Sequence, residues 1–239
     1  MKDTPVGLVV VSAGESRRLQ LGKRKPYLQL AGREIFLHTL DVFEQVPCII
    51  NKVLVVNPKD VQEVKANWNE ELDRFGVSAV VEGGASRQES VLNGVRSLDA
   101  ECEWVAIHDA VRPFVRAEDI TRTVQAAAET GAAILAAPMK ETIKENRGGS
   151  RIGRTIPRAL LWGAQTPQVF PREKYLEVSA RAIEENWEVT DDAQLFELAG
   201  LEVTLVEGSY DNIKITTEAD WRIAQGMVST IGHLRAETE

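Results

Sequence analysis

The chain has 239 residues, of which 44% are hydrophobic and 27% are charged, as in an ordinary globular protein. Its formal net charge of −8 argues against nucleic acid or a membrane surface as the main binding partner. Two widely spaced cysteines, Cys48 and Cys102, argue against a disulfide framework and a zinc site. The first apolar run, Val6–Val11, is too short for a signal-peptide core or a membrane span, so we expect a cytoplasmic protein.

Short apolar runs rich in β-branched residues alternate with helical patterns over the first 138 residues. The runs predict strands at Val6–Val11, Lys52–Val56, Ser78–Val81, Trp104–Ile107 and Ala132–Ala136. The segments between them predict helices at Glu34–Gln45, Lys59–Arg74, Arg87–Leu98 and Glu118–Thr130. This alternation indicates an α/β fold, in which helices cover both faces of a parallel sheet.

The alternation stops after Pro138. The polar, glycine-containing stretch Lys140–Arg158 predicts a β-hairpin arm that leaves the sheet and is either disordered or paired with another chain. Beyond the arm, we expect helices at Arg172–Asn186, Asp191–Ala199 and Glu218–Ile231, and strands near Val203–Val206 and Ile213–Ile215. No repeat or linker interrupts the pattern, so one domain over residues 1–239 is the simplest organisation.

Ligands of open α/β sheets bind beyond the carboxyl ends of the strands, where the first loop here reads Ser12–Arg18. Its small residues allow close approach of an anion, and five cations gather in nine residues: Arg17, Arg18, Lys23, Arg24 and Lys25. Neither a dinucleotide fingerprint nor a Walker A motif is present. We favour a triphosphate site over a solvated surface or a purely structural turn.

The second and third loops also carry unusual residues. Gly83-Gly84 is either a plain tight turn before a helix that Ser86 caps, with Glu89 completing a capping box, or the platform for a pyrimidine base near Ser90. Asp109 ends a central strand, where burying a carboxylate without a partner is costly. It therefore indicates a Mg²⁺ ligand or a partner for a substrate hydroxyl, with a salt bridge to Arg112 as the alternative.

Together these loops resemble the 2-C-methyl-D-erythritol 4-phosphate cytidylyltransferases over essentially the whole chain. The resemblance is carried by seven segments in order: Ala13–Arg18, Lys25 before Tyr27-Leu28, Gly83-Gly84 through Arg87 and Ser90, His108–Pro113, Leu161–Gln168, Thr190–Ala193 and Asp211–Thr216. The first segment alone is weak, because many nucleotidyltransferases carry a similar loop. This chain departs from the family in having Arg24 before Lys25 and Pro26 after it, so Lys23 or Arg24 could share the role of Lys25.

The resemblance implies a Rossmann-like fold with a mostly parallel sheet, and a homodimer clasped by the β-arm, residues 139–159. It implies transfer of CMP from CTP to methylerythritol phosphate, with Mg²⁺ or another divalent cation and with Asp109 near the metal. The implied catalytic residues are Arg18, Lys25, Arg158 and Lys214, and Arg158 would reach the neighbouring subunit's site. The implied nucleotide-binding residues are Ala13, Gly14, Gly83, Gly84, Arg87, Ser90 and Thr166. The implied acceptor-binding residues are Asp109, Arg112, Thr142 and Thr190.

The residue types suit this chemistry. A phosphate monoester has its second pKa near 6, so the acceptor is already deprotonated at neutral pH and needs no general base. The reaction needs cations that stabilise charge at the α-phosphate and on the leaving pyrophosphate. Three alternatives stay open at this point: another acceptor such as ribitol 5-phosphate, a guanylyl transferase, and a non-catalytic nucleotide-binding protein.

Overall fold

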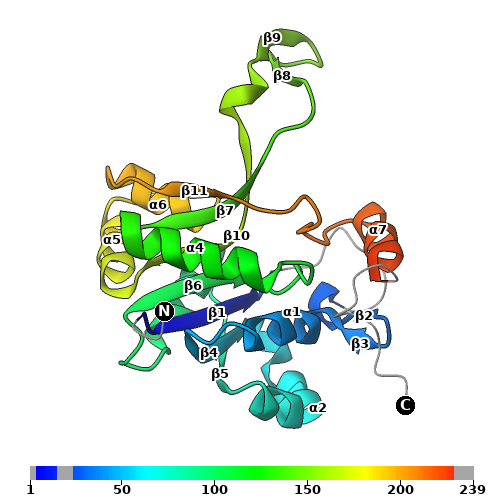
Figure 1. The fold of residues 1–239 in the computed structure, drawn as a ribbon, viewed down its shortest axis with the longest axis vertical. Coiled ribbons are helices and arrows are strands. Elements are labelled where there is room, and N and C mark those ends of the chain that lie inside the picture. The colour runs from blue at the N-terminus through cyan, green and yellow to red at the C-terminus, as the bar shows by residue number, and fades with distance from the viewer. Residues whose placement is uncertain (1–3, 15–23, 229–239) are drawn as a thin grey trace.

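A seven-stranded sheet forms the centre of the protein in the computed structural model, which describes residues 4–14 and 24–228 (Figure 1). The strand order is β11-β7-β10-β6-β1-β4-β5, and β10 alone of these strands runs antiparallel to its neighbours. The strands are β1 (Val6–Ser12), β4 (Ile49–Val56), β5 (Val77–Glu82), β6 (Trp104–Asp109), β7 (Ala133–Pro138), β10 (Trp162–Pro171) and β11 (Thr204–Glu207). The expected mostly parallel α/β sheet is confirmed.

Helices cover both faces of the sheet because successive strand residues point to opposite sides. On one face, Leu8 of β1 packs in a core with α1 (Ile35–Glu44), α2 (Val61–Arg74) and α4 (Ala117–Thr130). On the other face, Val9 packs with α3 (Arg87–Arg96), α5 (Arg172–Glu184) and α6 (Asp192–Leu198). A smaller core joins α7 (Glu218–Val228) to the short strands β2 (Gln29–Leu30) and β3 (Arg33–Glu34) and to the start of α1.

Two segments differ from the expectation. Residues 162–171 form β10, which sequence patterning did not predict because Gly163 and Pro167 disfavour a central strand. The sheet tolerates them through a register shift between Ala164 and Gln168 in the pairing with β7. Ile213–Ile215 was expected to form a strand and does not. It runs as an irregular segment, held by a hydrogen bond from the Ile215 amide to the Val111 carbonyl at 3.0 Å.

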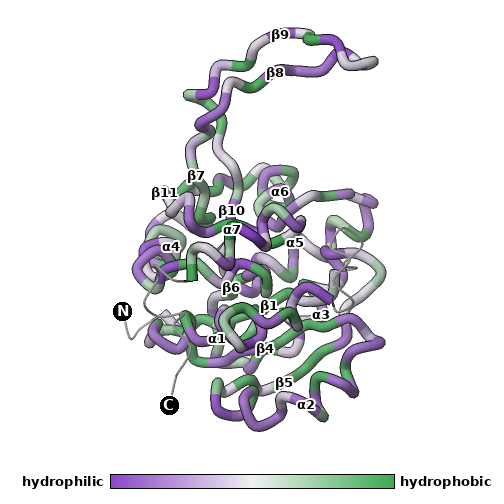
Figure 2. The backbone as a smooth tube through the Cα atoms, turned by 90° about the vertical axis from the view of Figure 1, so that its right-hand side faces the viewer, coloured by the Kyte–Doolittle hydropathy of each residue, from purple (hydrophilic) through white to green (hydrophobic). Residues whose placement is uncertain are grey.

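The predicted hairpin arm is present and projects away from the sheet (Figures 1 and 2). Its strands, β8 (Ile143–Asn146) and β9 (Ile152–Ile156), pair antiparallel around a turn in which Gly148 and Gly149 have positive φ angles. Along the arm, Ile152 is 67% exposed and Leu160 is 79% exposed. The arm lacks the packing that the rest of the fold has, and an isolated two-stranded hairpin of this kind is only marginally stable in water.

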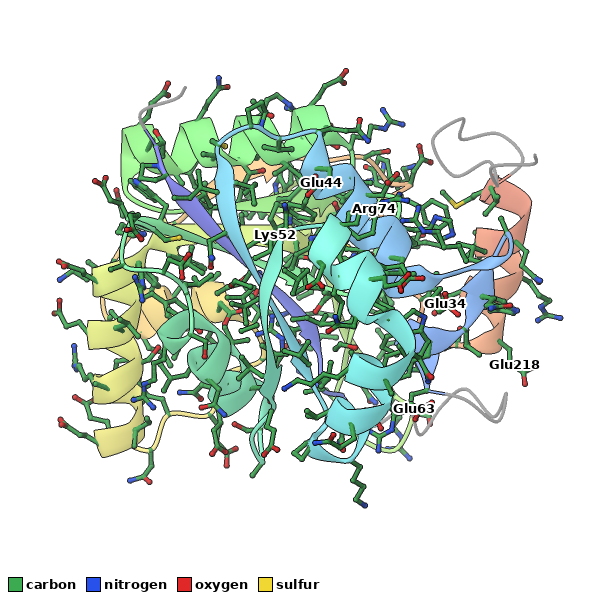
Figure 3. All side chains as sticks on the ribbon, turned by 90° about the horizontal axis from the view of Figure 1, so that it is seen from below. Glu34, Glu44, Lys52, Glu63, Arg74 and Glu218 are labelled. Atoms are coloured by element: carbon green, nitrogen blue, oxygen red, sulfur yellow. The ribbon has the colours of Figure 1, made fainter. Side chains whose placement is uncertain are left out.

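Buried polar contacts secure the sheet on the side of α1 and α2. Lys52 of β4 forms an ion pair with Glu44 of α1, and its ammonium donates to the Phe75 carbonyl at 3.0 Å (Figure 3). Because a buried ammonium is costly unless it is paired, these contacts fix the two helices against the strand. None of the helices in the described ranges is long and apolar enough to cross a membrane.

Candidate active site

A cavity of about 530 Å³ lies where β1, β4 and β6 end and the chain turns from β5 into α3. Eight of the residues predicted to be functional line it: Ala13, Gly14, Lys25, Gly84, Arg87, Ser90, Asp109 and Lys214. It is therefore built from segments spread over the sequence, as expected for the carboxyl edge of a parallel sheet.

The loop after β1 is held in place by close backbone packing. The Asn57 side chain donates to the Ala13 carbonyl at 3.4 Å, and the Gly83 amide donates to the Val56 carbonyl at 2.7 Å. A Cβ atom at Gly83 would lie 2.4 Å from Cβ of Ala13 and 3.2 Å from the Val56 carbonyl oxygen. Only glycine fits there, so Gly83 shapes the cavity wall although it does not line it.

The start of α3 confirms that Ser86 caps the helix, whereas Glu89 bonds the amide one residue before the cap and not the cap amide that a capping box requires. The Ser86 hydroxyl accepts a hydrogen bond from the Glu89 amide at 3.0 Å, and the Glu89 carboxylate accepts one from the Ala85 amide at 2.7 Å. Ser90 extends this network, because its hydroxyl accepts from the Gly84 amide and donates to the Ser86 carbonyl. These contacts hold Gly84 at the cavity wall in a fixed conformation.

Asp109 is the most strongly paired carboxylate at the cavity. Its Oδ2 atom lies 2.9 Å from Nζ of Lys214 and accepts a hydrogen bond from Nε of Arg112 at 3.1 Å. Burial alone would raise the pKa of the Asp109 carboxyl, but Lys214 and Arg112 hold that pKa well below its usual range. The salt-bridge interpretation of Arg112 is thus confirmed.

His108 lies behind Asp109 and connects two predicted site residues. The Arg112 carbonyl can only accept, so Nε2 of His108, 3.2 Å away, carries the ring proton and donates to it. In the neutral ring, Nδ1 then accepts from the Thr166 hydroxyl at 2.9 Å, and that hydroxyl accepts from the Asp109 amide at 3.2 Å. Complete burial lowers the pKa of His108 to about 4, so the ring is neutral at physiological pH.

The two described cations of the first loop have different surroundings. Lys25, in the 3-10 turn Lys25–Tyr27, is 9% exposed and lines the cavity. Arg24 forms an ion pair with Asp60 at 3.2 Å and is absent from the cavity lining. Arg17, Arg18 and Lys23 lie outside the described residues.

Three predicted residues lie away from the cavity wall. Thr142 and Arg158 belong to the arm, where Nη1 of Arg158 donates to the Lys140 carbonyl at 2.6 Å. Thr190 precedes α6, and both its amide and its hydroxyl donate to the Gln194 side chain. None of the three is among the residues that line the cavity.

The cavity also contains residues that sequence reasoning missed. Asn57 and Thr216 line it, and so does Ser12 at the end of β1. Asn57 directly follows β4, so the rule that ligands bind beyond strand ends could have identified it. Thr216 ends the family-like segment Asp211–Thr216 but was given no role, because it comes close to the sheet only through the irregular segment before α7.

Comparison with known proteins gives one consistent result. Residues 6–230 match the family model for 2-C-methyl-D-erythritol 4-phosphate cytidylyltransferase. Enzymes of that name from Halalkalibacterium halodurans and Alkaliphilus oremlandii are 39% and 37% identical, each over 93% of this chain and over 96% and 94% of their own length. The crystal structure of 4-diphosphocytidyl-2C-methyl-D-erythritol synthase from Anaerococcus prevotii superposes with a TM-score of 0.82 at 30% identity, covering 94% of this chain and 96% of that one. The chain belongs to the 2-C-methyl-D-erythritol 4-phosphate cytidylyltransferase family, whose activity is CTP-dependent cytidylylation of 2-C-methyl-D-erythritol 4-phosphate for isoprenoid synthesis.

Proposed function

We propose that the cavity at the strand ends is the cytidylyl-transfer site of this enzyme. One observation carries the proposal: the ion-paired Asp109–Lys214–Arg112 cluster faces a glycine-lined loop and Lys25 around one cavity. The loops around Ala13, Gly83 and Ser90 would hold the cytidine, and Thr166 would support them from behind. Asp109, Arg112 and Thr190 would bind the acceptor.

The chemical step needs charge stabilisation and no general base. An oxygen of the acceptor phosphate attacks the α-phosphorus of CTP, a new P–O bond forms, and the bond from the α-phosphorus to the bridging oxygen breaks. The electron pair of that bond leaves with pyrophosphate. Lys25, together with Arg18, would neutralise the charge that builds on the α-phosphate, and Lys214 would hold the acceptor phosphate nearby.

Mg²⁺ fits this site as a companion of the triphosphate. Among the described residues, no group of three or more His, Cys, Asp or Glu side chains is placed to hold a metal ion. Among the described residues, both cations that pair with Asp109 contact Oδ2, so Oδ1 would be the metal ligand. Binding through phosphates and one carboxylate is usual for Mg²⁺, which then neutralises phosphate charge.

The arm supports a homodimer. Ile152 on the arm and Leu160 just after it are exposed and need cover, and Thr142 and Arg158 lie on the arm, away from their own cavity. We infer that the arm, residues 139–159, clasps a second copy and brings Arg158 to the partner's acceptor phosphate. Residues 1–239, with the arm included, would form one nucleotidyltransferase domain, and the unpaired, buried Cys48 and Cys102 suit the cytoplasm.

The assignment of Lys25 can be tested by pyrophosphate release from CTP and Mg²⁺ with methylerythritol phosphate. Lys25→Ala and Arg18→Ala should each reduce kcat by about 10²–10³-fold, the loss typical of a charge-stabilising donor. Arg24→Ala is the matched control, because its ion pair with Asp60 keeps that guanidinium out of the cavity. An equal loss in all three variants would contradict the distinct role of Lys25.

Ribitol 5-phosphate offered in parallel tests the acceptor pocket. We expect release with methylerythritol phosphate alone. Equal rates of pyrophosphate release with both acceptors would show that Asp109, Arg112 and Thr190 do not select the acceptor. No release with either acceptor would overturn the placement of catalysis in this chain.

A further inference from the structure

One buried carboxylate outside the cavity is paired with a cation that lines it. Asp192, the first residue of α6, is 1% exposed. Its Oδ2 atom lies 2.6 Å from Nη1 of Arg87, and its Oδ1 atom accepts a hydrogen bond from the hydroxyl of Tyr175 at 2.8 Å. Tyr175, on α5, is fully buried, so three helices meet at this carboxylate.

Groups other than the Asp192 carboxylate satisfy the backbone amides at the start of α6. Oε1 of Gln168, on β10, accepts hydrogen bonds from the amides of Asp192 and Ala193 at 3.0 and 2.9 Å. The side chain of Asp191 caps the helix by accepting from the Gln194 amide at 3.1 Å. Since other groups satisfy the helix terminus, the side chain of Asp192 serves a different purpose.

That purpose concerns Arg87. This arginine is the first residue of α3, where the positive end of the helix dipole disfavours a cation. Burial disfavours the charge too, but Asp192 and then Asp109 more than offset it and raise the pKa of Arg87 above its ordinary value. Burial and Asp192 likewise raise the pKa of Tyr175, which stays protonated and donates to the carboxylate. The guanidinium is therefore held, fully charged, at the cavity wall.

We propose that Asp192 and Tyr175 are positioning residues, which fix the guanidinium of Arg87 so that its remaining N–H donors bind an oxygen of CTP. The carboxylate of Asp192 pairs with one end of the planar guanidinium of Arg87, and the hydroxyl of Tyr175 prevents that carboxylate from rotating. A guanidinium oriented in advance loses less conformational freedom when CTP binds. This inference rests on the proposed placement of CTP in the cavity.

The test measures CTP binding by calorimetry, and kcat and KM for CTP, in the full-length enzyme. Asp192→Asn keeps the shape of the side chain and removes its charge, and should weaken CTP binding about tenfold, as for loss of a charged partner. Tyr175→Phe should weaken it less, and in the same direction. Asp191→Asn is the matched control, because it alters the same helix terminus without touching Arg87 and should stay within about twofold of wild type.

The decisive comparison is made in an Arg87→Ala background. If Asp192 acts through Arg87, adding Asp192→Asn to Arg87→Ala should weaken CTP binding no further than Arg87→Ala alone. The inference would be overturned if the losses of CTP affinity caused by Arg87→Ala and Asp192→Asn multiply in the double variant. It would also be overturned if Asp191→Asn and Asp192→Asn lose CTP affinity equally. If Asp192→Asn does not fold, the Tyr175→Phe and Arg87→Ala pair gives the same test. Wild-type enzyme that binds no CTP would overturn the proposed site as well, whereas wild-type affinity in Asp192→Asn would overturn the positioning role alone.

Discussion

At the scale of single residues, His108 and Asp109 are neighbours whose pKa values are both lowered, with opposite consequences for their charge. Complete burial keeps the His108 ring neutral, because the charged form would lose its hydration. Asp109 stays ionised because Lys214 and Arg112 outweigh the same burial. The site therefore combines an uncharged ring that orients the backbone with a carboxylate that orients cations.

The neutral ring makes the free energy of unfolding depend on pH. An unfolded chain binds a proton at His108 below about pH 6.5, whereas the folded chain does so only near pH 4. Stability should thus fall as pH drops through this window, by on the order of 2 kcal/mol between pH 7.5 and pH 5. Loss of the Asp109 ion pairs adds to the fall only below about pH 4, the ordinary pKa of a carboxyl.

Urea unfolding of metal-free protein at several pH values checks this, with His108→Asn as the comparison. The variant should be less stable at pH 7.5, and its stability should decline less between pH 7.5 and pH 5. Parallel curves for the two proteins would show that His108 is not the group responsible.

At the scale of elements, the arm is an excursion between two strands that are already neighbours. β7 and β10 pair antiparallel, with Pro138 opposite Trp162 and a hydrogen bond from the Met139 amide to the Leu161 carbonyl at 3.0 Å. A tight Asn-Gly turn could join such strands directly. The fold of the sheet therefore does not need the arm.

Replacing residues 140–160 by Asn-Gly should give a folded monomer with little change in melting temperature. Its activity should fall steeply, since Thr142 and Arg158 are removed. Light scattering after gel filtration measures the oligomeric state, calorimetry measures the melting temperature, and pyrophosphate release measures the activity. A control variant that carries only Ile152→Ser and Leu160→Ser keeps the length of the arm. A shortened protein that remained dimeric would contradict the role of the arm.

Elements built from local patterning could be predicted, and those that depend on distant partners could not. The buried strands and the helices between them followed from apolar periodicity, and Asp109 and Arg112 followed from their place at a strand end. β10 was missed because Gly163 and Pro167 disfavour a strand locally, while pairing with β6 and β7 stabilises one. The contacts of Gln168 and Asp192 depend on that strand, so they too were hidden from sequence reasoning.

At the scale of the whole molecule, bound CTP would contact segments that are far apart in the sequence, from residue 13 to residue 214. A ligand present at 100 times its dissociation constant stabilises a protein by about 2.7 kcal/mol. For a chain of this length, that corresponds to a rise in melting temperature of roughly 5–10 °C. Calorimetry with CTP and Mg²⁺ should show this rise, and the same concentration of GTP should not. Equal shifts with both nucleotides would contradict a cytidine-specific cavity.

The position of β10 also bears on how the chain is made. It lies between β6 and β7, which precede it in sequence, so a ribosome releases both of its neighbours before β10 itself. Until then, β6 presents one unpaired edge and β7 presents two, because the other neighbour of β7, β11, is made after β10 as well. Such edges are templates for wrong partners, including other nascent chains. The arm lengthens this exposed interval by the time needed to synthesise it, so the feature that we propose to join two finished subunits would also delay completion of each one.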